Sequence, residues 1–356
     1  MKKNIAFFNI YKIWGGGEKW HFEMALNLKK KGHNVYVFSP EEGEFSRRAN
    51  ENGLGVKYIN WSKYSYFNPI RIISLALIFR RLNVDILLYN SFLDVREAGL
   101  SAFLAGINRK IFRIGMPISP KRKLFNKLSF SLGIDVINFI SKDIFSVFKR
   151  DVYSFIRGKK HFFLTNGINP ELFTPRLSQP CSKVIVGNCV RLSKQKGLKY
   201  FIEVANNFKD RDNIEFVIGG DGEQKDELER LVKSYGLSEK VKFAGFQENP
   251  EDFMNNIDIL LFTSEFEGTA RTVIEGLFCE KPVVCFDISS MKELIEHGQD
   301  GFKVEPFNLD IMSSSLEKLI YDQPLREKMG KNGRRKALRE YDIREIRKEW
   351  EKVILE

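Results

Sequence analysis

Short apolar runs alternate with helical patterns at regular spacing through the second half of this 356-residue chain. The runs are rich in Val, Ile, Leu and Phe, as strands that are buried on both faces require. This alternation predicts a parallel sheet covered by helices, in which ligands bind beyond the carboxyl ends of the strands. We expect strands at 184–188, 214–218, 241–244, 257–262 and 282–286, and helices at 197–209, 223–235, 251–255 and 272–278.

The first half shows the same alternation in a less regular form. A glycine loop at 15–17 leads into a helical pattern at 18–31, and strands are predicted at 4–8, 35–38, 85–88 and 135–140. The chain length favours two domains, and the loop-forming residues between Leu164 and Pro175 mark a boundary between them. We therefore expect domains at 1–175 and 176–340, followed by an amphipathic helix at 341–356.

Several classes of protein are excluded by simple features of the sequence. The longest apolar run, 72–79, is too short to span a bilayer, and the basic start is followed by too brief an apolar run for a signal peptide. The four cysteines form no CxxC pair, so we expect no zinc site and a reducing, cytoplasmic location. Asp210-Arg211-Asp212 looks like a metal-binding DxD motif, but its place between a helix and a strand indicates a surface loop.

Positive charge is concentrated in the first half of the chain. Residues 1–176 hold 29 Lys and Arg against 13 Asp and Glu, whereas the remainder is slightly acidic. Within this half, seven cations and no acid occur between Ala98 and Ile134, interleaved with apolar residues. The stretch Arg109–Lys127 is therefore predicted to dock on an anionic membrane surface. An ordinary solvated face is an equally good interpretation, and nucleic-acid binding would rest on charge alone.

A turn of small residues follows the apolar run 257–262. There a strand ends, backbone N–H groups become free and a helix begins, which is an arrangement that binds phosphate. Glu267 and Glu275 stand eight residues apart, and on a helix this spacing places both carboxylates on nearly one face. Because a carboxylate repels phosphate, we expect both residues to bind sugar hydroxyls instead.

The positive partners of a phosphate are expected in the loop after the first strand of the second half. This loop, Asn188 to Gly197, contains Arg191 and Lys196. Arginine offers a planar fork to phosphate oxygens and lysine a compact point charge. The two loops together predict a site for a phosphorylated sugar compound.

Four stretches together resemble the retaining glycosyltransferases of family GT4. They are Gly15-Gly16-Gly17-Glu18, the loop from Arg191 to Gly197, Ile218-Gly219-Gly220-Asp221-Gly222, and the pair Glu267 and Glu275. The segment from Asn166 to Pro175 is similar to the interdomain segment of that family. The resemblance implies an α/β protein of the GT-B fold, in which two Rossmann-like domains face each other across a deep cleft. It also implies that the helix at 341–356 packs back on the first domain.

The resemblance also implies a role for each matching residue. Arg191 and Lys196 would bind the diphosphate of a nucleotide-sugar donor. Glu275 would bind the ribose and Glu267 the donor sugar, so that Arg191, Lys196 and Glu267 form the catalytic set. Other donor contacts are implied for Gly16, Gly17, Gly245, Phe246, Gly268, Thr269, Ala270, Arg271 and Thr272.

The sequence departs from the family pattern in the first domain. Family members often carry a histidine in the loop that corresponds to Phe112–Pro117, and this loop has none. His21 lies three residues beyond Glu18 and is the histidine that could approach the cleft. Thr269 and Ala270 also replace the more usual aromatic–glycine pair.

The function expected from these features is retaining transfer of a sugar from a UDP- or GDP-sugar to a cell-envelope or lipid-linked glycan. The cations and helix amides would stabilise the leaving diphosphate, so no metal or other cofactor is required. We expect a cytoplasmic enzyme on the inner face of the plasma membrane, with no nucleic-acid partner. A GT-B nucleotide-sugar epimerase and a non-catalytic nucleotide-sugar-binding subunit are the alternatives.

Overall fold

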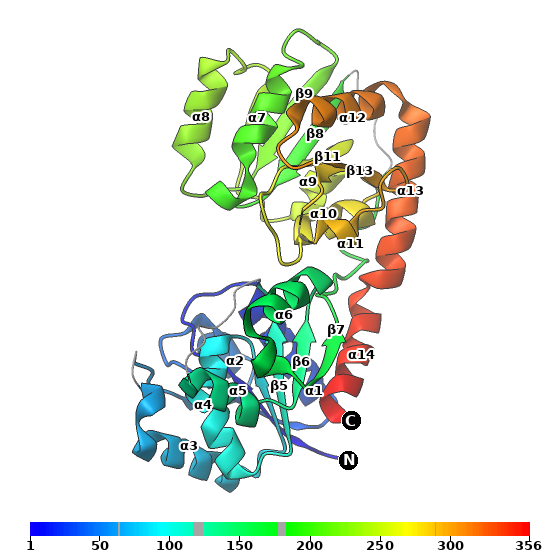
Figure 1. The fold of residues 1–356 in the computed structure, drawn as a ribbon. Helices are drawn as coiled ribbons and strands as arrows, with labels where there is room; N and C mark the ends of the chain where they lie inside the picture. Colours follow the sequence, from blue (N-terminus) through cyan, green and yellow to red (C-terminus); the bar gives the residue numbers. More distant parts are fainter. Residues whose placement is uncertain (63–64, 117–123, 177–182, 289) are drawn as a thin grey trace. The chain divides into compact units, whose positions relative to one another are not determined.

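The protein consists of two compact α/β units in a computed structural model that describes residues 1–62, 65–116, 124–176, 183–288 and 290–356. Unit 1 comprises Met1–Thr165 together with Arg347–Glu356, and unit 2 comprises Asn166–Ile346. Each unit contains one sheet in which every strand pair is parallel (Figure 1). The prediction of two parallel-sheet, Rossmann-like units is therefore confirmed.

Unit 1 has a seven-stranded sheet in the order β3-β2-β1-β4-β5-β6-β7. Helix α1 lies on one face of this sheet, and α3, α4 and α5 lie on the other (Figure 1). The elements are β1 Asn4–Phe8, α1 Gly16–Lys30, β2 Asn34–Ser39, α2 Glu44–Glu51, β3 Gly55–Tyr58, the 3-10 helix Ser65–Phe67, α3 Pro69–Arg81, β4 Ile86–Tyr89, α4 Phe92–Ala105, β5 Arg109–Ile114, α5 Leu124–Gly133, β6 Val136–Phe139, α6 Lys142–Ile156 and β7 Lys160–Phe163.

Unit 2 has a six-stranded sheet in the order β10-β9-β8-β11-β12-β13. Its elements are β8 Val184–Cys189, the 3-10 helix Lys194–Lys196, α7 Leu198–Asn206, β9 Ile214–Gly219, α8 Lys225–Ser234, β10 Val241–Gly245, α9 Pro250–Asn255, β11 Ile259–Phe262, α10 Arg271–Phe278, β12 Val283–Phe286, α11 Met291–Leu294, β13 Gly301–Val304, α12 Leu309–Tyr321 and α13 Gln323–Glu340. Helix α14, Ile343–Leu355, begins in unit 2 and ends in unit 1.

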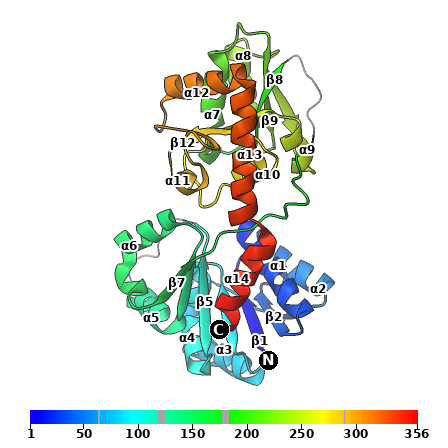
Figure 2. The same cartoon turned by 90° about the vertical axis from the view of Figure 1, so that its right-hand side faces the viewer.

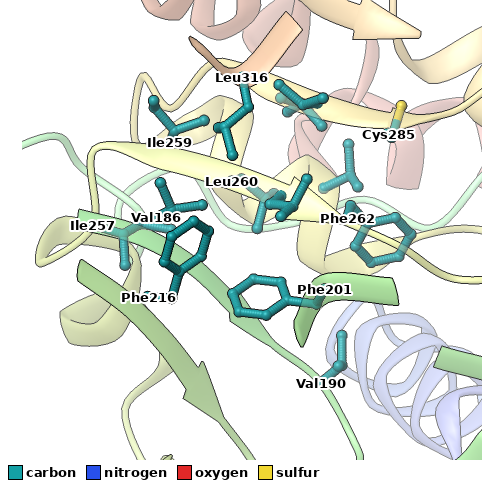
Figure 3. Packing of buried hydrophobic residues seen from close by; sticks show 14 of the residues in the cluster. Val186, Val190, Phe201, Phe216, Ile257, Ile259, Leu260, Phe262, Cys285 and Leu316 are labelled. Atoms are coloured by element: carbon teal, nitrogen blue, oxygen red, sulfur yellow. The ribbon is translucent and has the colours of Figure 1, made fainter. Parts of the chain in front are cut away.

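The core of unit 2 lies on both faces of the central strands β8 and β11. Leu260 on β11 and Phe216 on β9 are completely buried, and Phe201 of α7 packs edge-on against Phe216 with ring centroids 5.7 Å apart (Figure 3). Burial on both faces explains why these strands are continuous apolar runs rather than alternating ones. The strongest sequence signal thus arises from the part of the sheet that carries the candidate site.

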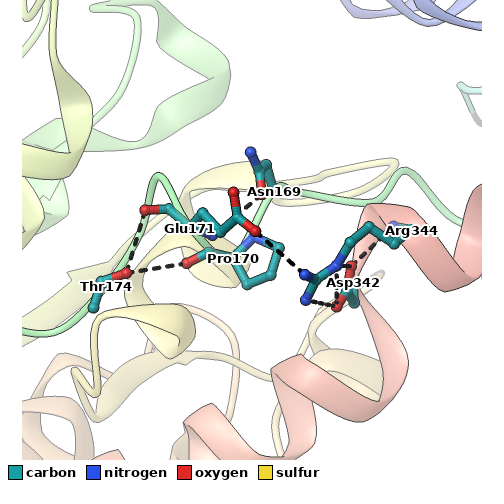
Figure 4. Close-up of polar contacts among 6 residues, drawn as sticks. All are labelled: Asn169, Pro170, Glu171, Thr174, Asp342 and Arg344. Atoms are coloured by element: carbon teal, nitrogen blue, oxygen red, sulfur yellow. Dashed lines mark hydrogen bonds and ion pairs between the residues drawn. The ribbon is translucent and has the colours of Figure 1, made fainter.

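The segment that follows unit 1 in the chain is attached to the start of α14 (Figure 4). Ile168 and Asp342 form a parallel bridge, and the Cα of Gly167 lies so close to Ile343 that no larger residue fits there. Arg344 pairs with Asp342 at 2.6 Å and reaches Glu171 at 3.4 Å. These contacts place the segment within unit 2.

The last ten residues complete the core of unit 1. Trp350 of α14 is fully buried, and its ring lies 4.4 Å from that of Trp20 on α1. Asn27 donates a hydrogen bond to Glu351, and the guanidinium of Arg109 donates to the carbonyl of Val353. An element distant in sequence therefore covers the apolar face of α1.

The interpretation of Arg109–Lys127 as one continuous docking stretch is wrong for its first part. Residues 109–114 form the interior strand β5, in which Lys110 and Arg113 are buried. The ammonium of Lys110 donates to the carbonyl of Ile107 and pairs with Asp135, so its aliphatic stem can lie in the core. Lys127 is exposed on α5, while Lys121, Arg122 and Lys123 fall outside the described residues. Within the described chain, every helix is too short or too polar to cross a membrane.

Replacing Trp350 by Ala is expected to destabilise unit 1 by about 3–5 kcal/mol, because the change removes a large buried ring and leaves a cavity beside Trp20. Tryptophan fluorescence during denaturant unfolding measures this effect specifically, since Trp14, Trp20, Trp61 and Trp350 all belong to unit 1. Trp61→Ala is the matched control, because Trp61 is exposed and its loss should change stability by about 0.5 kcal/mol or less. Equal effects of the two substitutions would contradict the packing role of α14.

Candidate functional site

The candidate site lies at the carboxyl ends of β8 and β11, two neighbouring strands at the centre of the unit 2 sheet. The chain continues from β8 toward β9 on one side and from β11 toward β12 on the other. The loops after these strands therefore diverge and leave a crevice, which is where open parallel sheets bind their ligands. Arg191 and Lys196 lie in the first loop, and Glu267 lies in the second.

Glycines hold the first loop in place. Gly220 has φ +123° and its Cα approaches the carbonyl of Val190, while Gly197 has φ +59° and approaches the carbonyl of Thr263. A Cβ at either position would overlap a backbone oxygen, so only glycine permits both the conformation and the contact. The backbone amide of Leu192 also donates to the backbone carbonyl of Asp221 at 2.9 Å. The loop is thus fixed against the glycine-rich turn after β9.

The two loops are joined by a short ion pair. Nζ of Lys196 lies 2.6 Å from Oε1 of Glu267, with 20% and 8% of the two side chains exposed. Gln195 adds two hydrogen bonds between the loops. Its side-chain amide donates to the backbone carbonyl of Phe266 at 2.8 Å, and its backbone carbonyl accepts from the backbone amide of Glu265 at 2.9 Å. The structure therefore brings together two of the three predicted catalytic residues.

Glu267 and Glu275 do not share a helix face, contrary to the spacing argument. Helix α10 begins at Arg271, after Ala270 with ψ 84°, so Glu267 belongs to the preceding turn. Glu275 lies on the helix and is buried, and Nε of Arg271 pairs with it at 2.7 Å. The two carboxylates thus have separate cationic partners, Lys196 in the first loop for Glu267 and Arg271 on the helix for Glu275.

Free backbone donors surround the start of α10. Among the described residues, no protein acceptor faces the amides of Gly268, Thr269, Ala270 and Thr272. The hydroxyl of Thr272 donates to the carbonyl of Cys189 at 3.0 Å, which ties the helix start to the end of β8. Free amides at the positive end of a helix dipole form an environment suited to an anion.

Arg191, Gly245 and Phe246 occupy more open positions. The guanidinium of Arg191 is largely exposed and pairs with Glu223 at 3.1 Å, so it is not held against Glu267 as Lys196 is. Gly245 ends β10 with φ +67°, and its carbonyl accepts from the amide of Gly220 at 2.7 Å. Phe246 exposes 73% of its surface directly beyond this point.

Gly16 and Gly17 begin helix α1 in unit 1. A side chain at Gly17 would collide with Asn90, which follows β4. Nδ2 of Asn90 donates to Glu18 at 3.3 Å, and Asn90 accepts in turn from the guanidinium of Arg113 at 3.0 Å. The glycine loop therefore lies at the switch point of the first sheet, between β1 and β4.

His21, the histidine that could approach the cleft, lies instead in the core of unit 1. His21 is fully buried and packs edge-on against Phe7 with ring centroids 5.1 Å apart. Burial, assisted by the charge of Arg113, holds the pKa of His21 well below its usual range. The ring is therefore a neutral part of the core, because position 21 falls on the inner face of α1.

Asn188 is a site residue that sequence reasoning passed over. It is buried near the end of β8, and neither the nitrogen nor the oxygen of its side-chain amide has a hydrogen-bond partner among the described residues. The sequence feature that could have indicated its role is a polar residue at the end of an otherwise apolar strand. Burial and the charge of Glu275 raise the pKa of the adjacent Cys189 to about 12, so this thiol stays protonated at neutral pH.

Within the described ranges, no three His, Cys, Asp or Glu side chains cluster closely enough to hold a metal ion. Asp210 and Asp212 are exposed between α7 and β9, at the opposite edge of the sheet from the candidate site.

Two family models match the chain. Residues 14–116 match the model described as Glycosyltransferase Family 4, and residues 175–336 match the model described as Glycosyl transferases group 1. The matched ranges contain the glycine loop of unit 1 and both loops of the unit 2 site.

Several curated relatives are glycosyltransferases. Over 147 residues the chain is 31% identical to alpha-D-kanosaminyltransferase of Streptomyces kanamyceticus. This alignment covers 40% of this chain and 38% of that protein. Over 166 residues it is 34% identical to N-acetylgalactosamine-N,N'-diacetylbacillosaminyl-diphospho-undecaprenol 4-alpha-N-acetylgalactosaminyltransferase of Campylobacter jejuni. This alignment covers 46% of this chain and 45% of that protein. The matches thus span less than half of each relative.

Solved structures share the fold over nearly the whole chain. HepE of Anabaena in complex with UDP has a TM-score of 0.84 and 19% identity, covering 99% of both chains. The same protein in complex with UDP-glucose gives a TM-score of 0.78 at 20% identity, covering 98% of both chains. At such identities the likeness concerns the fold alone.

The chain has two Rossmann-like units, and the solved structures that it resembles are glycosyltransferases of the GT-B fold. Its fold is therefore GT-B. The chain belongs to the GT4-like glycosyltransferases, as the family models over both units and the named relatives show.

The stability of unit 1 is expected to fall in acid because of His21. Its lowered pKa means that the unfolded chain takes up a proton near pH 6.5 while the folded chain does not, so stability present above that pH is lost below it. Between pH 7 and pH 5 the histidine can account for at most about 2 kcal/mol of this loss, measured by tryptophan fluorescence during unfolding. His21→Phe should remove this part of the pH dependence, and His161→Phe, at an exposed position of β7, should retain it. Identical pH profiles for wild type and His21→Phe would contradict the assignment.

Proposed function

We propose that this protein is a retaining glycosyltransferase that uses a UDP-sugar as donor. The observation that carries the proposal is the Lys196–Glu267 pair at 2.6 Å, located where free helix amides and the two diverging loops meet. A diphosphate needs cationic and N–H donors, and a sugar needs a carboxylate that accepts from its hydroxyls. Uridine is favoured over guanosine because the structurally similar HepE is described in complex with UDP and UDP-glucose.

In the proposed reaction, the bond between the sugar and the diphosphate breaks while charge builds up on the leaving oxygens. The ammonium of Lys196 and the amides of Gly268 to Thr272 stabilise this charge, and Arg191 turns from Glu223 to the diphosphate. Glu267 orients Lys196 and accepts hydrogen bonds from the donor sugar, and Glu275 binds the ribose. An acceptor hydroxyl attacks on the same face and passes its proton to a leaving-phosphate oxygen.

For the acceptor we propose a lipid-linked glycan of the cell envelope. The Campylobacter relative carries diphospho-undecaprenol in its name, and the Staphylococcus aureus relative is named a poly(ribitol-phosphate) alpha-N-acetylglucosaminyltransferase. An acceptor of this kind places the enzyme at the cytoplasmic face of the membrane. The reaction we propose needs no metal, because Lys196, Arg191 and the helix amides supply the positive potential.

The first test is calorimetric titration of UDP, GDP and ADP in the presence of a chelator. Wild type should bind UDP in preference to the others, and Lys196→Ala should weaken binding about tenfold or more, because a charged hydrogen bond to phosphate contributes about 1.5–3 kcal/mol. Lys199→Ala is the matched control, since Lys199 is exposed one turn further along and is 4.0 Å from Glu265. Binding that appears only after a divalent metal is added would overturn metal independence. Failure to bind any nucleotide would favour a protein that kept the fold and lost the activity.

Transfer should depend on the same residue. With UDP-glucose or UDP-N-acetylglucosamine and a lipid extract of cell envelopes, Lys196→Ala should lower turnover at least 100-fold, as expected for the loss of about 2.7–4 kcal/mol of charge stabilisation. The anomeric proton of the product, measured by NMR, should show the α configuration of the donor. A β-linked product would contradict retention, and isomerised donor in the absence of acceptor would indicate an epimerase.

A further inference from the structure

Helix α3 of unit 1 presents apolar side chains to solvent. Ile70, Ile73 and Leu77 are 75%, 54% and 44% exposed. Spacings of three, four and seven residues place all three on one face of a helix. The opposite face buries Leu75, Ala76 and Phe79 in the core. The helix is therefore apolar on both sides, which a helix that only covers a sheet does not require.

The neighbouring helices α4 and α5 also expose apolar side chains. Helices α3, α4 and α5 pack side by side on the same face of the unit 1 sheet (Figure 2). Gly99 of α4 and Gly133 of α5 meet backbone to backbone, which keeps these two helices close together. We call the combined surface the α3–α5 face, and its exposed apolar residues are Ile70, Ile73, Leu77, Ile78, Phe103, Leu104, Leu124 and Leu128.

The α3–α5 face is also free of exposed acidic groups. Residues 52–84 and 98–134 contain no Asp or Glu. The two acids between these ranges that lie on α4 are both buried: Asp94 accepts from the amide of Ile10 at 2.9 Å, and Glu97 pairs with Arg71. Exposed cations remain at Arg80, Arg81 and Lys127. Aliphatic side chains are thus combined with uncompensated positive charge.

We propose that the α3–α5 face docks unit 1 on an anionic lipid surface. Apolar side chains that enter the acyl boundary while neighbouring cations contact lipid phosphates are the features of an interfacial helix. A second copy of the chain is a less suitable partner for this face. A two-fold interface would bring the exposed cations of one copy close to the same cations of the other. With 13 residues, α3 is too short to cross the bilayer and would lie in its surface.

This assignment keeps only the end of the predicted stretch, Leu124 to Lys127 on α5, and adds α3 and α4 to the docking surface. Lys110 and Arg113 of β5 are buried, whereas α3 lies outside that stretch and exposes three aliphatic side chains on one face. The evidence is independent of nucleotide binding, which concerns unit 2. A lipid-linked acceptor, if the proposed function holds, would give the docking its purpose.

Flotation with phosphatidylglycerol-containing vesicles and with pure phosphatidylcholine vesicles tests the proposal. Wild type should float with the anionic vesicles and much less with the neutral ones. Ile70→Ser combined with Ile73→Ser should weaken binding at least tenfold, because two aliphatic side chains no longer enter the lipid. Arg81→Ser should weaken it about fivefold, in line with about 1 kcal/mol for each cation at an anionic surface.

Matched controls lie on unit 2. Ile311→Ser combined with Leu338→Ser removes exposed aliphatic residues, and Arg230→Ser removes an exposed cation, and neither change should affect flotation. Fluorescence unfolding of unit 1 and UDP binding by unit 2 should be unchanged in all variants, so loss of docking is distinguished from failure of the fold or of the proposed function. Equal flotation with both vesicle types would overturn the proposal. So would a self-association in solution that the double substitution on α3 abolishes.

Discussion

Parallel pairing of β8 with β11 at the centre of the second sheet is the constraint on which the candidate site depends. Because the chain leaves these two strands in opposite directions, a space opens between their following loops that no crossover covers. The rest of the site occupies that space: the loop of Lys196, the turn of Glu267 and the first turn of α10. The glycines at positions 197 and 220 contribute to this arrangement. They allow the loop of Lys196 to lie directly against the backbone that follows β11 and the backbone that follows β9.

Each buried carboxylate in this site is paired with a cation, so that neither charge of the pair is left without a partner. With Lys196 next to Glu267 and Arg271 next to Glu275, the buried carboxylates and their cations are compensated before any ligand arrives. Breaking such a pair leaves a charge in a poorly solvated place, so each partner holds the other in a defined orientation. A bound diphosphate would compete with Glu267 for Lys196, whereas sugar hydroxyls would satisfy the carboxylate released by that exchange. In the proposed function, binding of both parts of a donor would therefore be coupled through one ion pair.

The sequence was most informative where a strand is buried on both faces. The strands of unit 2 from β8 to β12 and the helices between them were predicted within a few residues, because apolar runs and helical periods are sharp there. Charged residues caused the errors elsewhere. Lys110 and Arg113 suggested a surface, although the aliphatic stem of Lys110 and the hydrogen bond of Arg113 to Asn90 allow both to lie in an interior strand. The spacing of Glu267 and Glu275 could not reveal where α10 begins, because a turn and a helix accommodate the same eight residues. Asn188 became informative only when its neighbours were known.

The path of α14 has a consequence for synthesis of the chain. Unit 1 needs Trp350 and its neighbours to cover α1, yet these residues are made 180 or so positions after the rest of that unit. At about 5–20 residues per second, a ribosome takes on the order of ten seconds or more to supply them. Throughout that interval, the nascent first unit exposes the ring of Trp20 and its apolar surroundings. Unit 2 can complete its sheet in the meantime, so the part of the protein that is translated first is the last to be finished.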